Sequence, residues 1–380
     1  RSLLTPHRTG VGEYTFELLD ALFKIDKANQ YFLFANAAGD SLKYLPKWEQ
    51  ENVHYIITRW PNKILSSSLC LFGKPKLDNW IIRNFDVWFS PNLNFTSVSQ
   101  HTKHILTIHD LSFEHFPDCY SWKRRAWHRA VNARRQCERA DIILTPSENT
   151  RRDVCETYAI PENKVKVLQP GLSSVFTKHG TWNPTSPRET GLRRASMEQV
   201  RQKYGLRGKF ILFLGTIEPR KNIVGLIEAY KILCPMPHAP CSMIIAGPLG
   251  WKYKPIIQMI EKTPGVRYIG YVAPEDKPAL YQLASLFVYP SLFEGFGFPV
   301  LEAMASGTPV VTSNRSSLPE IAGDAAYLVN PLNVAEMAEG MKIVLEDKHV
   351  RKMMIEKGKK HEGMFRWENT ARELLQSAIL

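Results

Sequence analysis

Two glutamates stand on either side of a glycine-rich turn in the segment EGFGFPVLEAMASGTPVV, residues 294–311. Glu294 and Glu302 are eight positions apart. The turn leads into an apolar stretch with Pro299 near its start and Gly307 just after its end, a pattern typical of a helix. The N–H groups at a helix start favour anions. A phosphate at this turn, with a carboxylate on each side to accept hydroxyl hydrogen bonds, would fit a ligand made of a sugar, a diphosphate and a ribose.

A second interpretation of the same two glutamates stays open at this point. Glu302 can complement the dipole of its own helix, and Glu294 can be a solvated loop residue. Spacing alone does not separate this interpretation from ligand binding, so other residues have to decide.

Two cations lie just before another predicted helix, in the segment GTIEPRKNIVGLIEAY, residues 215–230. At the start of a helix, Arg220 and Lys221 oppose the helix dipole by about 0.3–1 kcal/mol each unless an anion accompanies them. That mismatch favours phosphate binding. The alternative is a solvated turn in which Glu218 is the local counter-ion.

The first half of the chain offers weaker candidates. His109 follows the apolar run ILTI, so it is predicted at the carboxyl end of a strand, where α/β proteins bind their ligands. A single histidine is nevertheless more often structural than functional. Gly10 and Gly12 precede the first predicted helix, and a short G-x-G is weak evidence because most such pairs only make a turn.

The elements that must position these residues alternate between apolar β-type runs and helical patterns. The runs in the first half are YFLFAN, VHYIIT, DVWFSP, HILTIHD, ADIILTPS and KVKVLQPG, and those in the second half are KFILFLG, SMIIAG, VRYIGYV, SLFVYPS, TPVVTS and AAYLV. Residues 177–200 have the composition of a linker. The fold class is therefore predicted as α/β, with two doubly wound Rossmann-like domains, residues 1–176 and 201–364, facing an interdomain cleft. Residues 365–380 are predicted as a C-terminal helix that crosses back to the N-terminal domain.

The bulk composition agrees with two globular domains. The chain has 380 residues, of which 44% are hydrophobic, and a formal net charge of +12, which suggests anionic partners. Its six cysteines form no C-x-x-C pair, and no aspartates are spaced as D-x-D, so no metal site is predicted. No apolar run is long enough to span a bilayer, and the expected location is the cytoplasm. An apolar strand would normally precede a segment such as RSLLTPHRTGVGEY, so a short N-terminal piece is expected to be missing.

Several motifs in this order resemble those of glycosyltransferase family 4, whose members have the GT-B fold. The E-x7-E motif of that family matches Glu294 and Glu302, and its lysine-bearing loop resembles GTIEPRKN, with Lys221 at the matching position. AGPLGW, GVGEY, TIHDLSF and ADIILTPSENTRRDV also fit, so the resemblance covers nearly the whole chain. The branch that it most resembles is the bacterial mannosyltransferase-like branch that builds surface polysaccharides.

The resemblance implies transfer of a sugar from a nucleoside-diphosphate sugar to an acceptor hydroxyl, with retention at the anomeric carbon and with no metal or other cofactor. It further implies a role for each matching residue. Glu294 would hold the hydroxyls of the donor sugar, Glu302 the ribose, and Lys221 with Arg220 the leaving diphosphate. His109 would contact the donor sugar near the reacting centre. The remaining donor-binding positions would be the backbone of Phe296, Gly297 and Phe298 and the loop that contains Gly10 and Gly12.

The chain departs from the family pattern at one position. Many members carry an arginine five residues before the loop lysine, where this chain has Thr216, so Lys221 and Arg220 remain as the candidate phosphate cations. The resemblance favours GDP-mannose as the donor and a saccharide or lipid-linked saccharide as the acceptor, with a UDP-sugar as the alternative donor. A nucleotide-sugar epimerase and a non-enzymatic nucleic-acid-binding protein are the less favoured functions.

A basic segment suggests one further partner. Residues 121–140, SWKRRAWHRAVNARRQCERA, carry seven cations against the single acid Glu138, with two tryptophans among them. A basic amphipathic helix of this kind can lie on an anionic membrane, where a lipid-linked acceptor would be found. The location would then be peripheral, at the inner face of the cell membrane. The alternative is a solvated helix face whose tryptophans pack inward.

Overall fold

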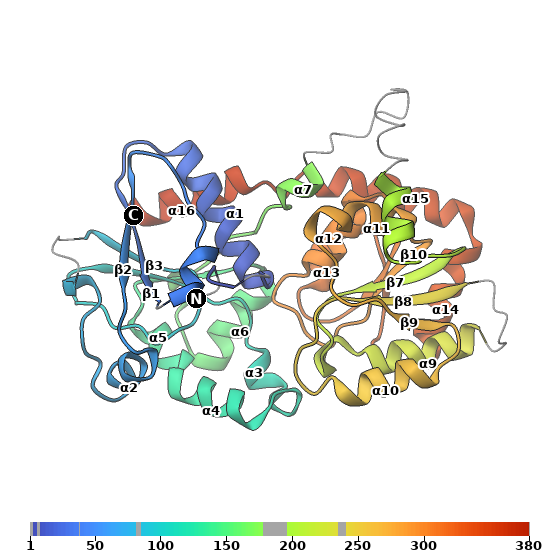
Figure 1. The fold of residues 1–380 in the computed structure, drawn as a ribbon, viewed down its shortest axis with the longest axis horizontal. Coiled ribbons are helices and arrows are strands. Elements are labelled where there is room, and N and C mark those ends of the chain that lie inside the picture. The colour runs from blue at the N-terminus through green and yellow to red at the C-terminus, as the bar shows by residue number, and fades with distance from the viewer. Residues whose placement is uncertain are drawn as a thin grey trace. The chain divides into compact units, whose positions relative to one another are not determined.

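The structure is a computed structural model, and it describes residues 3–5, 8–37, 39–80, 85–177, 196–234 and 241–379. By their internal contacts, these residues form two compact units, which are drawn in Figure 1. Unit 1 consists of Arg1–Leu111, Trp122–Ser173 and Phe365–Leu380, and unit 2 consists of Ser112–Ser121 and Ser174–Met364. Most of the predicted linker, residues 178–195, lies outside the described residues.

Unit 1 is an α/β unit whose described strands are all parallel. Its strands are β1 (Tyr31–Asn36), β2 (Val53–Thr58), β3 (Val87–Ser90), β4 (Lys103–Thr107), β5 (Ile142–Thr145) and β6 (Val165–Val167). Its helices are α1 (Gly10–Ile25), α2 (Asn62–Phe72), α4 (Trp122–Val131), α5 (Ala133–Arg139), α6 (Glu148–Tyr158) and α16 (Trp367–Ile379), with short 3-10 turns at Gly39–Tyr44, Asp78–Trp80 and Glu162–Lys164. Strands β1 and β2 form one sheet, and β3-β4-β5-β6 form another.

Unit 2 contains one parallel sheet of order β12-β11-β10-β7-β8-β9, in which the chain starts in the middle and winds to both edges. Its strands are β7 (Phe210–Leu214), β8 (Ser242–Ala246), β9 (Val266–Tyr268), β10 (Leu286–Tyr289), β11 (Val310–Ser313) and β12 (Tyr327–Val329). Its helices are α3 (Ser112–His115), α7 (Ser174–Thr177), α9 (Ile223–Leu233), α10 (Lys254–Lys262), α11 (Lys277–Leu283), α12 (Phe298–Ala305), α13 (Leu318–Ala322), α14 (Val334–Glu346) and α15 (Lys348–Glu362), with 3-10 turns at Pro117–Cys119, Pro219–Lys221 and Pro274–Asp276.

The core of unit 2 explains why its strands read as continuous apolar runs. Every residue of β7 and β10 is buried, because helices cover both faces of a parallel sheet. Figure 1 shows α9 and α10 on one face and α11, α12 and α13 on the other. The predicted α/β fold class is confirmed, and each predicted β-type run forms a strand in the structure.

The basic segment differs from its prediction as a single helix. It forms two helices, α4 and α5, and the break lies at Asn132. This residue has a φ of 50°, in the left-handed region that asparagine tolerates, and its side chain accepts a hydrogen bond from the N–H of Arg135 at 3.0 Å. A side chain that caps the second helix therefore interrupts the first.

Helix α16 packs against α1 within unit 1, and Figure 1 shows the two helices side by side. The residues just before α16 lie against the backbone at Gly171. There the N–H of Leu172 donates to the carbonyl of Phe365 at 3.1 Å. A Cβ at Gly171 would lie 2.2 Å from the backbone nitrogen of Trp367. Only glycine allows this approach.

We therefore expect Gly171→Ala to displace α16 from unit 1. The clash is with backbone, which cannot move aside as a side-chain tip can, so the cost should be roughly 3 kcal/mol. Limited proteolysis should cut within residues 365–379 faster than in the unchanged chain. Gly10→Ala is the control, because a Cβ there has no atom within 4 Å. Equal cleavage rates for the two variants would contradict the close packing.

Candidate active site

The loops after β7 and β8 of unit 2 run side by side and hold the lysine-bearing loop in place. Ile217 donates its N–H to the carbonyl of Pro248 at 2.9 Å, and Gly250 donates to the carbonyl of Ile217 at 3.1 Å. Gly247 has a φ of +128°, and a Cβ there would lie 2.0 Å from the carbonyl oxygen of Gly215. The two loops therefore fit only with glycine at that position, and they fix where the Pro219–Lys221 turn begins.

Both predicted cations are buried and paired with carboxylates. Lys221 Nζ lies 2.5 Å from Glu294 Oε1 and 2.8 Å from the Tyr289 hydroxyl. Arg220 lies 3.2 Å from Glu294 Oε2 and 2.9 Å from Glu218 Oε1. Glu218 is the counter-ion that the alternative interpretation expected, but the turn is not solvated, because Arg220 and Lys221 are only 8% and 7% exposed.

Glu294 lies at the centre of this network. Its Oε1 atom accepts from Lys221, from Ser291 at 2.6 Å and from Tyr289 at 3.0 Å, whereas Oε2 accepts from Arg220 alone among the residues that the structure describes. The serine hydroxyls that follow β11 hold its backbone, since Ser317 donates to the carbonyl of Glu294 at 2.9 Å. Oε2 can accept another hydrogen bond, and Lys221 uses two of its three N–H donors within the described residues. The pair is thus fixed but still able to bind a ligand.

Burial and neighbouring charge act against each other on these groups. Burial by itself would raise the pKa of Glu294, but the charges of Lys221 and Arg220 outweigh it and lower that pKa to about 2. Burial and the nearby Arg220 lower the pKa of Lys221, although Glu294 and Glu218 oppose them. Burial raises the pKa of Glu218. We infer that Glu294 is an anion at neutral pH.

The stability of unit 2 should therefore depend on pH through Glu294. Its folded pKa, about 2, is below its ordinary value of 4.5, so its contribution is complete above pH 4.5 and is lost as the pH falls toward 2. The loss should be about 3 kcal/mol, and protonation of Glu218 offsets part of it. Thermal denaturation measured from pH 5 to pH 3 should show a falling Tm. A Glu294→Gln variant with the same pH dependence would contradict this assignment.

The second glutamate of the motif has different partners. Glu302 lies on α12, 7% exposed, where Lys277 Nζ is 3.2 Å from Oε1 and the Tyr281 hydroxyl donates to Oε2 at 2.9 Å. Both partners belong to α11, of which Lys277 is the first residue. Within the described part of the chain, each carboxylate oxygen of Glu302 accepts one hydrogen bond, so each can accept another.

The turn between the glutamates has the geometry that its glycines predict. Gly297 has a φ of +117°, and no side chain caps α12 at this residue. Pro299 lies in the first turn of the helix, and Gly307, at φ +74°, follows its end, as the sequence predicts. The rings of Phe296 and Phe298 contact each other with their centroids 4.9 Å apart. The positive end of the α12 dipole therefore lies at the turn between Glu294 and Glu302.

The remaining candidates lie together in unit 1. His109 follows β4, and its Nε2 lies 2.9 Å from the carbonyl oxygen of Pro91. A carbonyl only accepts, so Nε2 carries the proton and Nδ1 is the ring nitrogen that can accept from a ligand. Burial lowers the pKa of His109, which keeps the ring neutral. Its ring meets Tyr14 of α1 edge to face, at 4.7 Å, and Gly10 and Gly12 form the first turn of that helix.

Sequence reasoning missed several side chains of the site. Tyr289 bridges Lys221 and Glu294, and Ser291, Ser316 and Ser317 hold the carboxylate or backbone of Glu294. Their signal was their place at or shortly after the carboxyl ends of β10 and β11, since the carboxyl ends of parallel strands meet at one edge of a sheet. Within the described residues, no group of three side chains could hold a metal ion, and no helix is long and apolar enough to cross a membrane.

Comparison with known proteins identifies relatives for both halves of the chain. The model of the family Glycosyltransferase Family 4 matches residues 8–174, and that of Glycosyl transferases group 1 matches residues 196–361. The O-antigen chain mannosyltransferase B of Escherichia coli is 30% identical over 97% of this chain and 95% of its own. The serotype-specific mannosyltransferase WbdA of Escherichia coli is 32% identical over 63% of this chain, and the match spans 29% of that longer relative.

Solved structures share the fold at low sequence identity. Alr3699/HepE of Anabaena, in complex with UDP and glucose, is 17% identical, has a TM-score of 0.70, and is matched over 98% of this chain and 96% of its own. WaaG, a glycosyltransferase involved in lipopolysaccharide biosynthesis, is 15% identical with a TM-score of 0.67, over 96% and 95% of the two chains.

Proposed function

The chain belongs to glycosyltransferase family 4 and is a glycosyltransferase of the GT-B fold, and from this premise we propose that it transfers mannose from GDP-mannose to a hydroxyl of a saccharide or lipid-linked saccharide. The product would belong to a surface polysaccharide, as the name of the Escherichia coli O-antigen relative suggests. Because the chain belongs to this family, a nucleotide-sugar epimerase and a nucleic-acid-binding protein are not proposed as its function.

One observation carries the assignment of the site, namely the buried pair Lys221–Glu294. Among the described residues, Lys221 keeps one N–H donor unused and Glu294 Oε2 keeps room for a further hydrogen bond. A donor sugar presents hydroxyls next to a diphosphate, and both groups can be bound at this pair. Lys221 and Arg220 would bind the diphosphate, while Glu294 Oε2 would accept from a sugar hydroxyl. Glu302, in the second turn of α12, would accept from the ribose hydroxyls.

The chemistry follows from this placement. As the bond between the anomeric carbon and the phosphate oxygen breaks, its electron pair goes to the β-phosphate and the sugar becomes oxocarbenium-like. Fixed cations and the dipole of α12 stabilise that charge. The acceptor hydroxyl attacks the anomeric carbon and gives its proton to the departing phosphate oxygen. Under this proposal the diphosphate is neutralised by side chains and backbone dipoles, and no cofactor takes part.

Retention of configuration is proposed to arise from attack on the face that the diphosphate leaves. The hydrogen bonds to Glu294 and its pKa of about 2 support this route, because they make its carboxylate a weak nucleophile. NMR assignment of the product anomer tests retention: an inverted linkage would contradict it. His109 Nδ1 is proposed to accept from the donor sugar, and the Gly10 loop to close over the phosphates.

A UDP-sugar is the second candidate donor, because the Anabaena structure that shares this fold was solved with UDP and glucose. Thermal-shift screening of GDP-mannose, GDP-fucose, UDP-glucose and UDP-galactose separates the two. We expect GDP-mannose to raise the Tm most, and less in a Lys221→Met variant. Stabilisation by UDP-sugars alone would show that the donor is a UDP-sugar and not GDP-mannose. Stabilisation by none of the four nucleotide sugars would overturn the proposal.

Helix α4 supports a contact with the membrane that carries a lipid-linked acceptor. Trp122 is 73% exposed rather than packed inward, although Trp127 packs against Phe95 with ring centroids 6.2 Å apart. At the end of α2, Leu71 and Phe72 are 73% and 74% exposed. Exposed apolar side chains beside a run of cations suit an anionic lipid surface.

We expect phosphatidylglycerol vesicles to retain the protein at low salt. Lys123→Glu should weaken that binding by roughly fivefold or more, since each cation near such a surface contributes about 1 kcal/mol. Trp122→Ser should weaken it as well. Lys342→Glu, an exposed lysine of α14, is the control with the same change of charge. Vesicle sedimentation measures the effect, and an equal loss in both charge variants would contradict a role for α4.

A further inference from the structure

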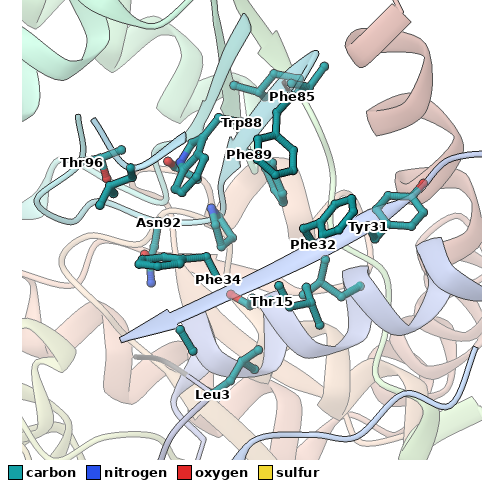
Figure 2. A pocket seen from close by; sticks show the side chains of 18 of the residues that line it. Leu3, Thr15, Tyr31, Phe32, Phe34, Phe85, Trp88, Phe89, Asn92 and Thr96 are labelled. Atoms are coloured by element: carbon teal, nitrogen blue, oxygen red, sulfur yellow. The ribbon is translucent and has the colours of Figure 1, made fainter. Parts of the chain in front are cut away.

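Two neighbouring residues of α1, Tyr14 and Thr15, have different surroundings. Thr15 lines a cavity of about 950 Å³ within unit 1, and so do Leu19 and Phe23 further along the same helix. Figure 2 shows Thr15 of α1 and Phe32 of β1 among the side chains around this cavity. Tyr14 is not one of the lining residues. Its side chain is buried among other groups.

Tyr14 contacts two other aromatic rings. Its ring centroid lies 4.7 Å from that of His109, with an interplanar angle of 86°. It lies 5.6 Å from the ring centroid of Trp367, with an angle of 72°. Both contacts are edge to face, the arrangement that aromatic rings favour at such distances. A residue of α1 thus connects the end of β4 with the first residue of α16.

The hydrogen bond of His109 does not by itself fix the orientation of the imidazole. The bond from Nε2 to the carbonyl of Pro91 directs one ring atom, but the ring can still tilt about that bond. The contact with Tyr14 acts on the plane of the ring, because a tilted imidazole would lose the edge-to-face geometry or overlap the phenol ring. The bond and the contact together determine where Nδ1 points.

The start of α16 is held firmly enough to support Tyr14. The Thr370 hydroxyl donates to the carbonyl of Gln169 at 2.7 Å. The backbone of Trp367 lies so close to Gly171 that a Cβ on the glycine would be 2.2 Å from the Trp367 nitrogen. Gln169 and Gly171 both belong to the segment that follows β6. Trp367 therefore has little freedom to move away from Tyr14.

We infer that Tyr14 is a positioning residue for sugar transfer, which holds the His109 ring so that Nδ1 is presented to the donor, and that Trp367 supports Tyr14 in this role. The contacts run from α16 through α1 to the end of β4. The C-terminal helix, which supplies none of the candidate site residues, thereby acts on the site. The effect on rate rests on the proposed role of His109, whereas the effect on the orientation of its ring does not.

The ring of Tyr14, and not its hydroxyl, makes these contacts. The hydroxyl is buried and has no hydrogen-bond partner among the residues that the structure describes. Phenylalanine keeps the ring and buries no unpaired donor. Tyr14→Phe should therefore fold normally and keep kcat within about twofold of the unchanged chain.

Tyr14→Leu removes the ring and should lower kcat by at least about 10-fold, because a small displacement of a group near the reacting centre has a large effect on rate. The affinity for GDP should stay within about twofold of the unchanged value, since the side chains proposed to bind the diphosphate and ribose lie in unit 2. A lower kcat with unchanged GDP binding separates loss of positioning from loss of the donor site.

Phe23→Leu is the matched control. Phe23 is a fully buried aromatic residue of the same helix, and its ring packs against those of Tyr31 and Trp48 rather than against His109. The same kind of ring is lost to the same smaller side chain. Phe23→Leu should therefore lower the Tm about as much as Tyr14→Leu does, but it should leave kcat unchanged.

NMR of protein labelled with 15N in its histidine rings measures the imidazole directly and requires no sugar donor. His109→Gln identifies the His109 signals. We expect the unchanged chain and Tyr14→Phe to carry the His109 proton on Nε2 alone. In Tyr14→Leu the ring can leave the Pro91 carbonyl, so its two nitrogens should show averaged shifts of both tautomers.

A Tyr14→Leu variant that turns over as fast as Phe23→Leu, or whose His109 keeps a single tautomer, would overturn the inference. If Tyr14→Leu does not fold, Trp367→Leu takes its place, because it keeps Tyr14 and removes the ring that supports it. Averaged nitrogen shifts and a loss of kcat of roughly threefold or more in that variant would support the inference, and values equal to those of the unchanged chain would overturn it. If the unchanged chain transfers no sugar, the proposed function fails, and the tautomer of His109 alone decides whether Tyr14 positions the ring.

Discussion

Glu294→Gln should lower kcat for sugar transfer by at least about 100-fold, because in the proposed mechanism this carboxylate holds the donor sugar beside the diphosphate. Glutamine has nearly the same size and can still accept from Ser291 and Lys221. The substitution leaves Arg220 and Lys221 with an excess of positive charge. Binding of GDP should therefore stay equal or become tighter while turnover is lost, a combination that misfolding would not produce.

Stability has to be measured alongside the rate for this variant. Breaking a buried ion pair by neutralising one partner costs about 3–5 kcal/mol, so the Tm of Glu294→Gln should fall as well. Glu346→Gln changes the same chemical group at an exposed position at the end of α14 and should leave both rate and Tm unchanged. A Glu294→Gln variant that turns over normally would remove Glu294 from the mechanism.

Gly247→Ala should be the most destabilising substitution in unit 2. The added Cβ would overlap the carbonyl oxygen of Gly215, and the backbone at φ +128° is one that alanine rarely adopts. We expect a loss of about 3–5 kcal/mol and a fall in Tm of roughly 10 °C. The loops after β7 and β8 would separate, and Lys221 would lose its fixed position opposite Glu294.

Gly208→Ala separates strain from steric overlap in this test. Gly208 also has a positive φ, +63°, but a Cβ there has no atom within 4 Å. It should cost only about 1 kcal/mol and leave transfer intact. Thermal denaturation and transfer rates of the two variants show whether backbone strain or steric overlap causes the loss of stability. Equal effects of the two would show that the loops do not need the close approach at Gly247.

The strands could be predicted from sequence because their apolar runs are short and bounded by turn residues. YFLFAN and VHYIIT form β1 and β2 with the predicted bounds. The helix after Glu294 was equally clear, since Pro299 and Gly307 mark its two ends. These signals are local, so no tertiary information was required. The break in the basic segment was harder to predict. It depends on the left-handed conformation of Asn132, whose side chain caps the start of α5.

The ion pairs of the site could not be predicted from local patterns. Lys221 and Glu294 are 73 residues apart, and their contact depends on β7 and β10 being neighbours in the sheet. The dipole argument placed an anion next to Arg220 and Lys221. The structure supplies carboxylates there, from Glu294 and Glu218, so in the free protein these side chains already compensate the two cations. In the proposed mechanism, the diphosphate has to compete with these two carboxylates for Arg220 and Lys221.

Calorimetric titration of GDP-mannose into the unchanged protein and into Lys221→Met tests the central claim most directly. The account predicts one binding site per chain, with affinity at least about 100-fold weaker in the variant, because the diphosphate would lose one of its two proposed cations. Equal affinity in the two proteins, or no binding to the unchanged protein, would contradict the claim that this site binds the donor.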